Sequence, residues 1–203
     1  MNKSYQIKIS WQPLWGLKFF TFCLCSFLIS EARIFSEQNF SFPKIKIAPG
    51  FEVRLVASDP IVKYPMMACL DDLGRLYVAE SDGRNLTTRA AIERELPRFV
   101  RQLVDVDGDG VFDKSTIFAD RMTMPEGGVW YDGALYIIAA PYLWRLEDLD
   151  GDGVADKRDK ILGSMEFDGR ANQHGPYLGP NGRLYFSGGH FGYDLIGTDG
   201  TSS

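Results

Sequence analysis

The nine residues DVDGDGVFD at 105–113 return as DLDGDGVAD at 148–156, 43 residues further along the chain. The two copies are identical at every Asp and Gly position. Because short Asp- and Gly-rich turns join neighbouring strands, this spacing indicates a structural unit that is repeated along the chain. The residues around the two copies indicate what else the unit contains.

Three further turns share a second pattern, in which Leu, Tyr and an apolar residue follow a turn that contains Gly. They are the stretches 72–78 (DLGRLYV), 132–137 (DGALYI) and 181–186 (NGRLYF). The Gly supplies the positive φ of a tight hairpin, and Leu and the residue after Tyr lie on one face of the next strand. Simple hairpins and acidic hairpins therefore alternate along the chain.

The repeated unit is typical of a blade of a β-propeller, because its period of 43 to 59 residues accommodates four short strands. We expect an all-β fold of four-stranded antiparallel sheets, with a helical insertion near 90–96. The prediction for 45–203 is an incomplete propeller with two full blades, the first half of a third and an N-terminal strand. Since closed propellers have about four to eight blades, the chain is expected to be the front part of a longer protein. A small sandwich of the same strands is the alternative.

The N-terminal segment has the pattern of a secretory signal. Lysines precede the uncharged run Phe19–Ile29, and Ser30 and Ala32 form a small-x-small cleavage site. As a helix the run spans about 16 Å, roughly half of the hydrocarbon thickness of a bilayer. The sequence predicts a signal peptide at 1–32 and export to the periplasm or cell envelope. An uncleaved N-terminal anchor and a buried helix of a cytosolic protein are the alternatives.

Composition and charge exclude several classes of protein. The 203 residues are 45% apolar and 13% aromatic, as in an ordinary globular domain. Twenty-two Lys and Arg against 27 Asp and Glu give a net charge of −5, so we expect no nucleic-acid partner. The three Cys are too few for a disulfide framework.

The acidic repeats have the donors of a calcium site. Carboxylates on alternate residues of a tight loop converge on one point, and several hard oxygen ligands suit Ca²⁺. The candidate ligands are Asp105, Asp107, Asp109, the Val111 carbonyl and Asp113 in the first loop, and Asp148, Asp150, Asp152, the Val154 carbonyl and Asp156 in the second. No flanking helices are predicted, and Thr116 and Asp159 stand at the twelfth position in place of the Glu of an EF-hand. The alternative is that the loops are simple β-turns without a metal.

The candidate catalytic residue is His174, in the stretch NQHGP at 172–176. A neutral imidazole accepts a proton near pH 7, so either His174 or the other histidine, His190, is a candidate general base. The alternative is a structural or solvated loop histidine. Other catalytic templates, including a P-loop, GxSxG, CxxC and the haem-attachment motif CxxCH, are absent from the sequence.

Residues 45 to 197 resemble the N-terminal propeller of the membrane-bound dehydrogenases of planctomycetes and verrucomicrobia. The resemblance rests on the run APGFEV at 48–53, the acidic loops, PEGG at 125–128, NQHG at 172–175 and GPNGRLY at 179–185. These proteins are similar to the glucose/sorbosone dehydrogenases that use pyrroloquinoline quinone (PQQ). The resemblance implies an exported sugar or alcohol dehydrogenase with Ca²⁺ in its blade loops.

The same resemblance implies roles for particular residues and partners. His174 takes the place of the base that deprotonates the substrate hydroxyl, while the groups that bind PQQ lie in later blades. Electrons would leave to a cytochrome domain of the full-length protein, so haem is not expected in this chain. A half-propeller does not enclose quinone and substrate, so we expect this chain alone to be inactive. The alternative is a non-catalytic, calcium-stabilised propeller that binds a glycan or a protein.

Overall fold

The computed structural model describes residues 4–8, 45–169, 173–189 and 193–197. It divides into two compact units, one formed by Met1–Tyr5 with Leu55–Ser203 and the other by Gln6–Arg54. The strands β1 (Ser4–Lys8) and β2 (Glu52–Ala57) form a two-stranded sheet. Each of these strands has residues in both units.

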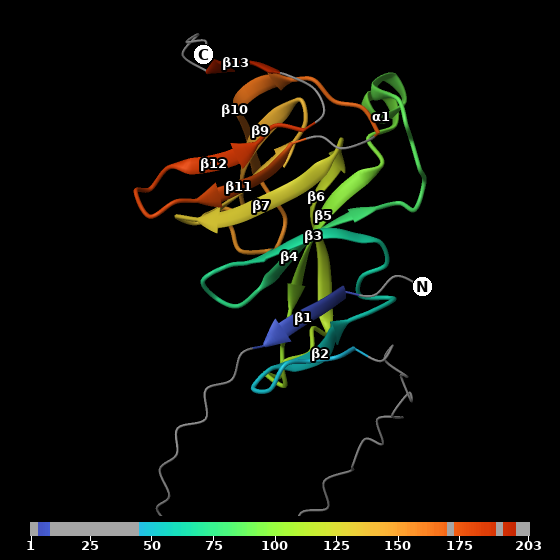
Figure 1. Ribbon diagram of the computed structural model, residues 1–203, viewed down its shortest axis with the longest axis vertical. Helices are drawn as coiled ribbons and strands as arrows, with labels where there is room; N and C mark the ends of the chain where they lie inside the picture. The colour runs from blue at the N-terminus through green and yellow to red at the C-terminus, as the bar shows by residue number, and fades with distance from the viewer. Residues whose placement is uncertain (1–3, 9–44, 170–172, 190–192, 198–203) are drawn as a thin grey trace, which may run out of the picture. The chain divides into compact units, whose positions relative to one another are not determined.

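The larger unit is mostly β, as predicted, and consists of antiparallel sheets (Figure 1). The first sheet has the order β3 (Pro65–Leu70), β4 (Leu76–Ser81), β5 (Arg98–Val104) and β6 (Lys114–Met122). The second repeats this meander with β7 (Pro125–Tyr131), β8 (Ala134–Ala139), β9 (Tyr142–Glu147) and β10 (Lys157–Met165). The hairpin of β11 (His174–Leu178) and β12 (Leu184–Ser187) follows. The prediction of four-stranded antiparallel sheets is therefore confirmed.

The predicted hairpin turns form where the sequence placed them. Gly74, Gly133 and Gly182 have φ values of 79°, 74° and 73°, in the left-handed region that Gly adopts without a steric cost. In the strand after the first of these turns, Leu76 and Val78 join one apolar cluster. Tyr77 between them joins another, so the strand is buried on both faces.

The strand β13 (Tyr193–Gly197) was not predicted in its position. It pairs with the outer strand of the second sheet, with Leu162 opposite Gly197 and Gly163 opposite Ile196. It does not continue the β11–β12 hairpin. The outer edge of β10 would otherwise present unpaired N–H and C=O groups, and pairing with β13 satisfies them.

The insertion between β4 and β5 contains the helix α1 (Arg89–Glu95), which confirms the helical turns expected there. Thr88 caps its first turn, because the threonine hydroxyl accepts a hydrogen bond from Ala91 N–H at 3.3 Å. The helix ends at Leu96, whose φ of 44° is left-handed. Ile92 is fully buried in a cluster with Met124, Ala140 and Phe167, which anchors the insertion.

The main apolar core lies between the first and second sheets. Tyr77 of β4 stacks on Trp130 of β7, with ring centroids 5.1 Å apart, and meets the edge of Phe118 of β6 at 4.9 Å. Its other buried members are Val100, Ala119, Met122, Leu135, Ile137, Ala139, Leu146 and Ala155. Because this cluster draws on both meanders, neither sheet buries its apolar face without the other.

The first strands of the repeats lie side by side, with β7 between β3 and β11 (Figure 1). A Cβ on Gly128 of β7 would lie 2.8 Å from the Met67 methyl carbon of β3, and one on Gly127 would overlap the backbone of Gly175 in β11. These glycines permit the close approach of the strands. We call the end of the sheets where β3, β7 and β11 begin the first rim. The opposite end, where β5 and β9 end, is the second rim.

Of the predicted N-terminal signal at 1–32, only β1 falls within the described residues, and 1–3 and 9–32 lie outside them. The helices found in the described ranges include none with both the length and the apolar character to cross a bilayer.

Replacing Leu135 with Ala should destabilise the fold by about 2–5 kcal/mol, because the side chain is fully buried between the two sheets. The measurement is urea unfolding followed by circular dichroism. Leu73→Ala is the matched control, because Leu73 lies in the equivalent hairpin region but is 78% exposed, and it should change stability by no more than about 0.5 kcal/mol. Equal effects of the two substitutions would contradict the core described above.

Candidate functional site

The first acidic loop joins β5 to β6 and is organised by its own carboxylates. Asp105 accepts hydrogen bonds from the N–H groups of Gly108 and Gly110, both at 2.8 Å. Asp109 accepts one from Val111 N–H at 2.7 Å, and Asp113 one from Val106 N–H at 3.2 Å. The side chains thus satisfy the amides of a tight turn and face inward toward its centre.

The second acidic loop joins β9 to β10 and repeats the same hydrogen bonds at equivalent positions. Asp148 accepts from Gly151 N–H at 2.7 Å and from Gly153 N–H at 2.9 Å. Asp156 accepts from Leu149 N–H at 2.7 Å, as Asp113 does from Val106. Both loops connect strands, so the prediction that they lack the flanking helices of an EF-hand is confirmed.

Only part of each predicted ligand set converges. One carboxylate oxygen from each of Asp105, Asp107 and Asp109 lies within 4.8 Å of the others, and the same holds for Asp148, Asp150 and Asp156. Asp113 and Asp152 belong to neither group. The N–H groups of Val111 and Val154 bind Asp109 and Asp152, so these valines are held on the loops. Each loop therefore offers three clustered carboxylates.

Each acidic loop also binds the strand that precedes its own sheet. The eighth residue of the first loop, Phe112, donates its N–H to Val56 O of β2 at 2.8 Å. The eighth residue of the second loop, Ala155, donates its N–H to Phe118 O of β6 at the same distance. Each loop therefore connects its own sheet to the strand before that sheet. The contact of β2 with the first loop is equivalent to the contact of β6 with the second loop.

A buried polar network supports the second loop from the first sheet. Gln102 donates to the Tyr77 hydroxyl at 2.9 Å, and Asp71 binds Arg75 at 2.5 Å and Tyr77 at 3.4 Å. Burial raises the pKa of Tyr77 to about 12, so its hydroxyl stays protonated. A Cβ on Gly153 would lie 3.0 Å from the Gln102 amide oxygen, so the loop backbone rests against this network. Sequence reasoning missed the network because Gln102 of β5 is distant in the chain from the turn that carries Asp71 and Arg75.

The thiol of Cys69 lies beside the same network in β3. Burial, reinforced by the charge of Asp71, raises the pKa of Cys69 to about 12. The residue is therefore a thiol rather than a thiolate at neutral pH and is not a candidate nucleophile.

His174 is the first residue of β11 and is exposed at the first rim. Its backbone pairs with Ser187 of β12. Within the described ranges no carboxylate lies within 4 Å of the imidazole, so no orienting acid is found there. Its neighbour Asn172 and the other histidine, His190, lie outside the described residues. The predicted base is thus accessible to a ligand, and no ion pair with another described residue fixes it.

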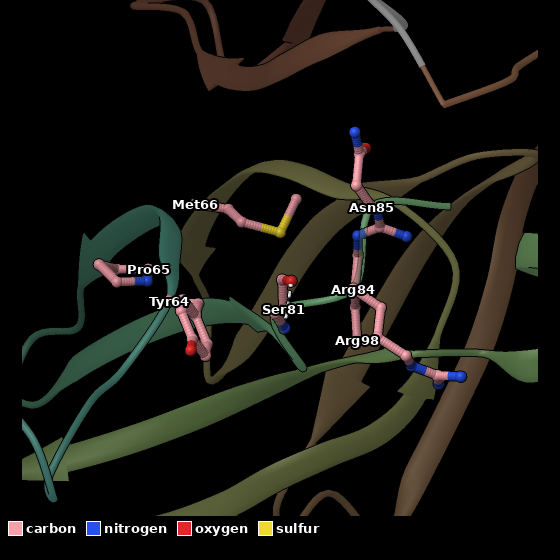
Figure 2. A pocket seen from close by; sticks show the side chains of 8 residues that line it. Tyr64, Pro65, Met66, Ser81, Arg84, Asn85 and Arg98 are labelled. Carbon is pink, nitrogen blue, oxygen red and sulfur yellow. Dashed lines mark hydrogen bonds between the residues drawn. The ribbon is translucent and has the colours of Figure 1, made fainter. Parts of the chain in front are cut away.

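A pocket of about 360 Å³ lies at the first rim, where β3 begins, β4 ends and β5 begins (Figure 2). Tyr64, Pro65 and Met66 lie on one side of it and Arg84, Asn85 and Arg98 on the other, with Ser81 between them. Sequence reasoning did not single out these residues, since they come from three separated segments.

The two arginines of this pocket differ in charge balance. Arg84 binds Asp82 at 2.5 Å and Glu95 at 2.6 Å, so two carboxylates offset its charge. Arg98 is 7% exposed and donates to Thr123 O at 2.9 Å, and burial lowers the pKa of its guanidinium. The pocket therefore offers the donors of two guanidinium groups, with Asp82 and Glu95 paired to Arg84 and the charges of Glu126 and Asp82 acting on Arg98.

Replacing Gly151 with Ala should cost about 1 kcal/mol, because its φ of 83° is left-handed but no atom lies within 4 Å of the new methyl group. Gly153→Ala combines a φ of 90° with the close approach to Gln102 and should cost about 1 kcal/mol more. Thermal unfolding of both variants measures the difference. Equal costs would mean that the second loop does not rest on the Tyr77 network.

Comparison with known proteins gives a family without an assigned function. The model of the domain of unknown function DUF7133 matches residues 37–202. No curated protein and no solved structure matches the chain. Since the match spans both acidic loops and all the sheets described for the larger unit, the chain belongs to the DUF7133 family.

Proposed function

We propose that the larger unit forms successive blades of a calcium-stabilised β-propeller in an exported protein. The observation that carries this proposal is the pair of hydrogen bonds from Phe112 to Val56 and from Ala155 to Phe118. The same loop position binds the outer strand of the layer before it in both repeats. Such nearest-neighbour repetition, with the first strands of the units side by side, is the arrangement of blades around a propeller axis.

Bound Ca²⁺ would stabilise these contacts between each acidic loop and the strand before its sheet. Three carboxylates within 4.8 Å of one another repel, and a divalent cation relieves that repulsion. Hard carboxylate oxygens with nearby carbonyls and water are the ligands that Ca²⁺ takes, and Asp107 and Asp150 are exposed enough to bind it from solvent. Because each loop also contacts the preceding layer, a bound ion would stabilise the joint as well as the loop.

Adding Ca²⁺ at about 100 times its dissociation constant should raise the free energy of unfolding by about 2.7 kcal/mol for each site. Asp107→Ala should remove the calorimetric binding heat of the first loop and Asp150→Ala that of the second. Asp72→Ala, in an exposed turn outside both loops, is the control and should keep both heats. Heats that are unchanged in Asp107→Ala and Asp150→Ala would refute the metal assignment.

A second proposed function is oxidation of a sugar or alcohol, in which the imidazole of His174 would accept the proton of the substrate hydroxyl. Its support is the exposed position of His174 at the start of β11, beside the first strand of the second repeat. PQQ is the cofactor that the resemblance implies, and His174 does not line the pocket of Figure 2. That pocket is therefore not the site at which His174 would meet the cofactor.

Dye-linked oxidation of sugars by the full-length protein with PQQ and Ca²⁺ tests this second function. We expect turnover that His174→Ala reduces by at least about 100-fold, the usual contribution of a general base. Tyr177→Ala, an exposed change on the same strand, should leave turnover unchanged. Absence of turnover, or equal rates in wild type and His174→Ala, would favour a non-catalytic propeller that binds a glycan or a protein.

A further inference from the structure

A second cavity, of about 290 Å³, opens at the first rim between the end of β6 and the face of the second sheet that packs against the first. Residues from α1, the end of β6, the turn between β8 and β9, β9 and β10 line it. Its volume is close to the lower limit of about 300 Å³ for small-molecule sites, so it accommodates a ligand of about one ring. His174 is not among its lining residues, so the cavity is separate from the function proposed for that residue.

One wall of the cavity is a fixed aromatic pair. The rings of Tyr142 and Trp144 meet edge to face, with centroids 5.7 Å apart and an interplanar angle of 87°. The indole N–H of Trp144 donates to Ala139 O at 3.2 Å, which sets its orientation. The Tyr142 ring packs so closely on Gly163 that a Cβ there would collide with it. The pair therefore presents a rigid surface to a ring-shaped ligand.

Two cations line the cavity, and neither has a carboxylate partner among the residues that the structure describes. The ammonium of Lys160 lies 4.2 Å from the ring centroid of Tyr142 and 5.3 Å from that of Trp144. Arg121 is exposed at the end of β6, where its φ of 54° is a left-handed conformation that few non-glycine residues adopt. Within the part of the chain that the structure describes, no carboxylate lies within 4 Å of either side chain.

The carboxylates near the cavity already have cationic partners, although Glu93 and Glu166 share one guanidinium. Arg89 binds Glu93 at 3.0 Å and Glu166 at 2.9 Å, and Arg158 binds Asp120, the neighbour of Arg121, at 3.0 Å. The lining therefore carries an excess of positive charge in a protein whose net charge is −5. Ser164 adds a hydroxyl to the same lining.

We propose that this cavity binds a carboxylate carried on a six-membered ring. The ring would pack against Tyr142 and Trp144 while the carboxylate accepts charge-assisted hydrogen bonds from Lys160 and Arg121. An acidic sugar and an aromatic acid share this chemistry. The proposal depends on neither the calcium sites nor catalysis by His174.

Isothermal titration of the full chain at low salt with glucuronate, glucose and benzoate tests the proposal. We expect glucuronate or benzoate to bind, and glucose, which has the ring but no charge, to bind at least about tenfold more weakly. Lys160→Gln and Arg121→Gln should each weaken acid binding about tenfold, since each removes a charged donor. Lys157→Gln is the matched control on the same strand, because its ammonium is paired with Glu147 and Asp159 and lies outside the cavity, and it should change nothing.

The outcomes separate the two sources of the ligand. Binding of glucuronate alone would identify an acidic sugar, and binding of benzoate alone an aromatic acid. Binding of neither acid would overturn the proposal. It would also fail if glucose bound as tightly as glucuronate, or if Lys160→Gln and Lys157→Gln behaved alike. Circular dichroism of each variant verifies that a loss of binding is not a loss of fold.

Discussion

The contact between successive sheets is the constraint on which the rest of this structure depends. Tyr77 contacts Trp130 and Phe118 within one cluster that spans both meanders, and the Ala155 N–H binds Phe118 O at the edge of that cluster. Without the neighbouring sheet, each meander would expose a broad apolar face to water. The second acidic loop completes the same interface through Gly153 and Gln102, so packing and loop geometry stabilise one another.

The two ends of the sheets have different chemical character. Both acidic loops lie at the second rim, where their carboxylates are used in turn formation and form the proposed cation sites. His174 and both cavities lie at the first rim, where loops of different length and an inserted helix provide varied side chains. In the functions proposed above, the second rim holds the repeats together and the first rim binds ligands. Substitutions at one end need not disturb the other.

The sequence predicts local features well, because their causes are local. The positive φ of Gly74 and its equivalents, the carboxylate-to-amide bonds of Asp105 and Asp148, and the short helix of the insertion all follow from residues within one turn of each other. The pairing of β13 with β10 does not follow from local residues, because the backbone of β13 could form the same hydrogen bonds with several strand edges. The cavity lined by Lys160 and Arg121 likewise joins segments that are distant in the chain. His174 was found as an isolated residue, and its exposure depends on strand placement that the motif does not encode.

The stacking of Tyr77 on Trp130 provides a spectroscopic probe of the contact between the two sheets. The two rings belong to different sheets, lie 5.1 Å apart and are inclined by only 20° to each other. Arg75 covers the indole, with its guanidinium carbon 5.8 Å from the ring centroid. Aromatic rings that are fixed against one another contribute to near-ultraviolet circular dichroism, and this contribution is lost when tertiary packing is lost even if secondary structure persists. The near-ultraviolet circular dichroism of this pair therefore reports on the contact between the first two sheets.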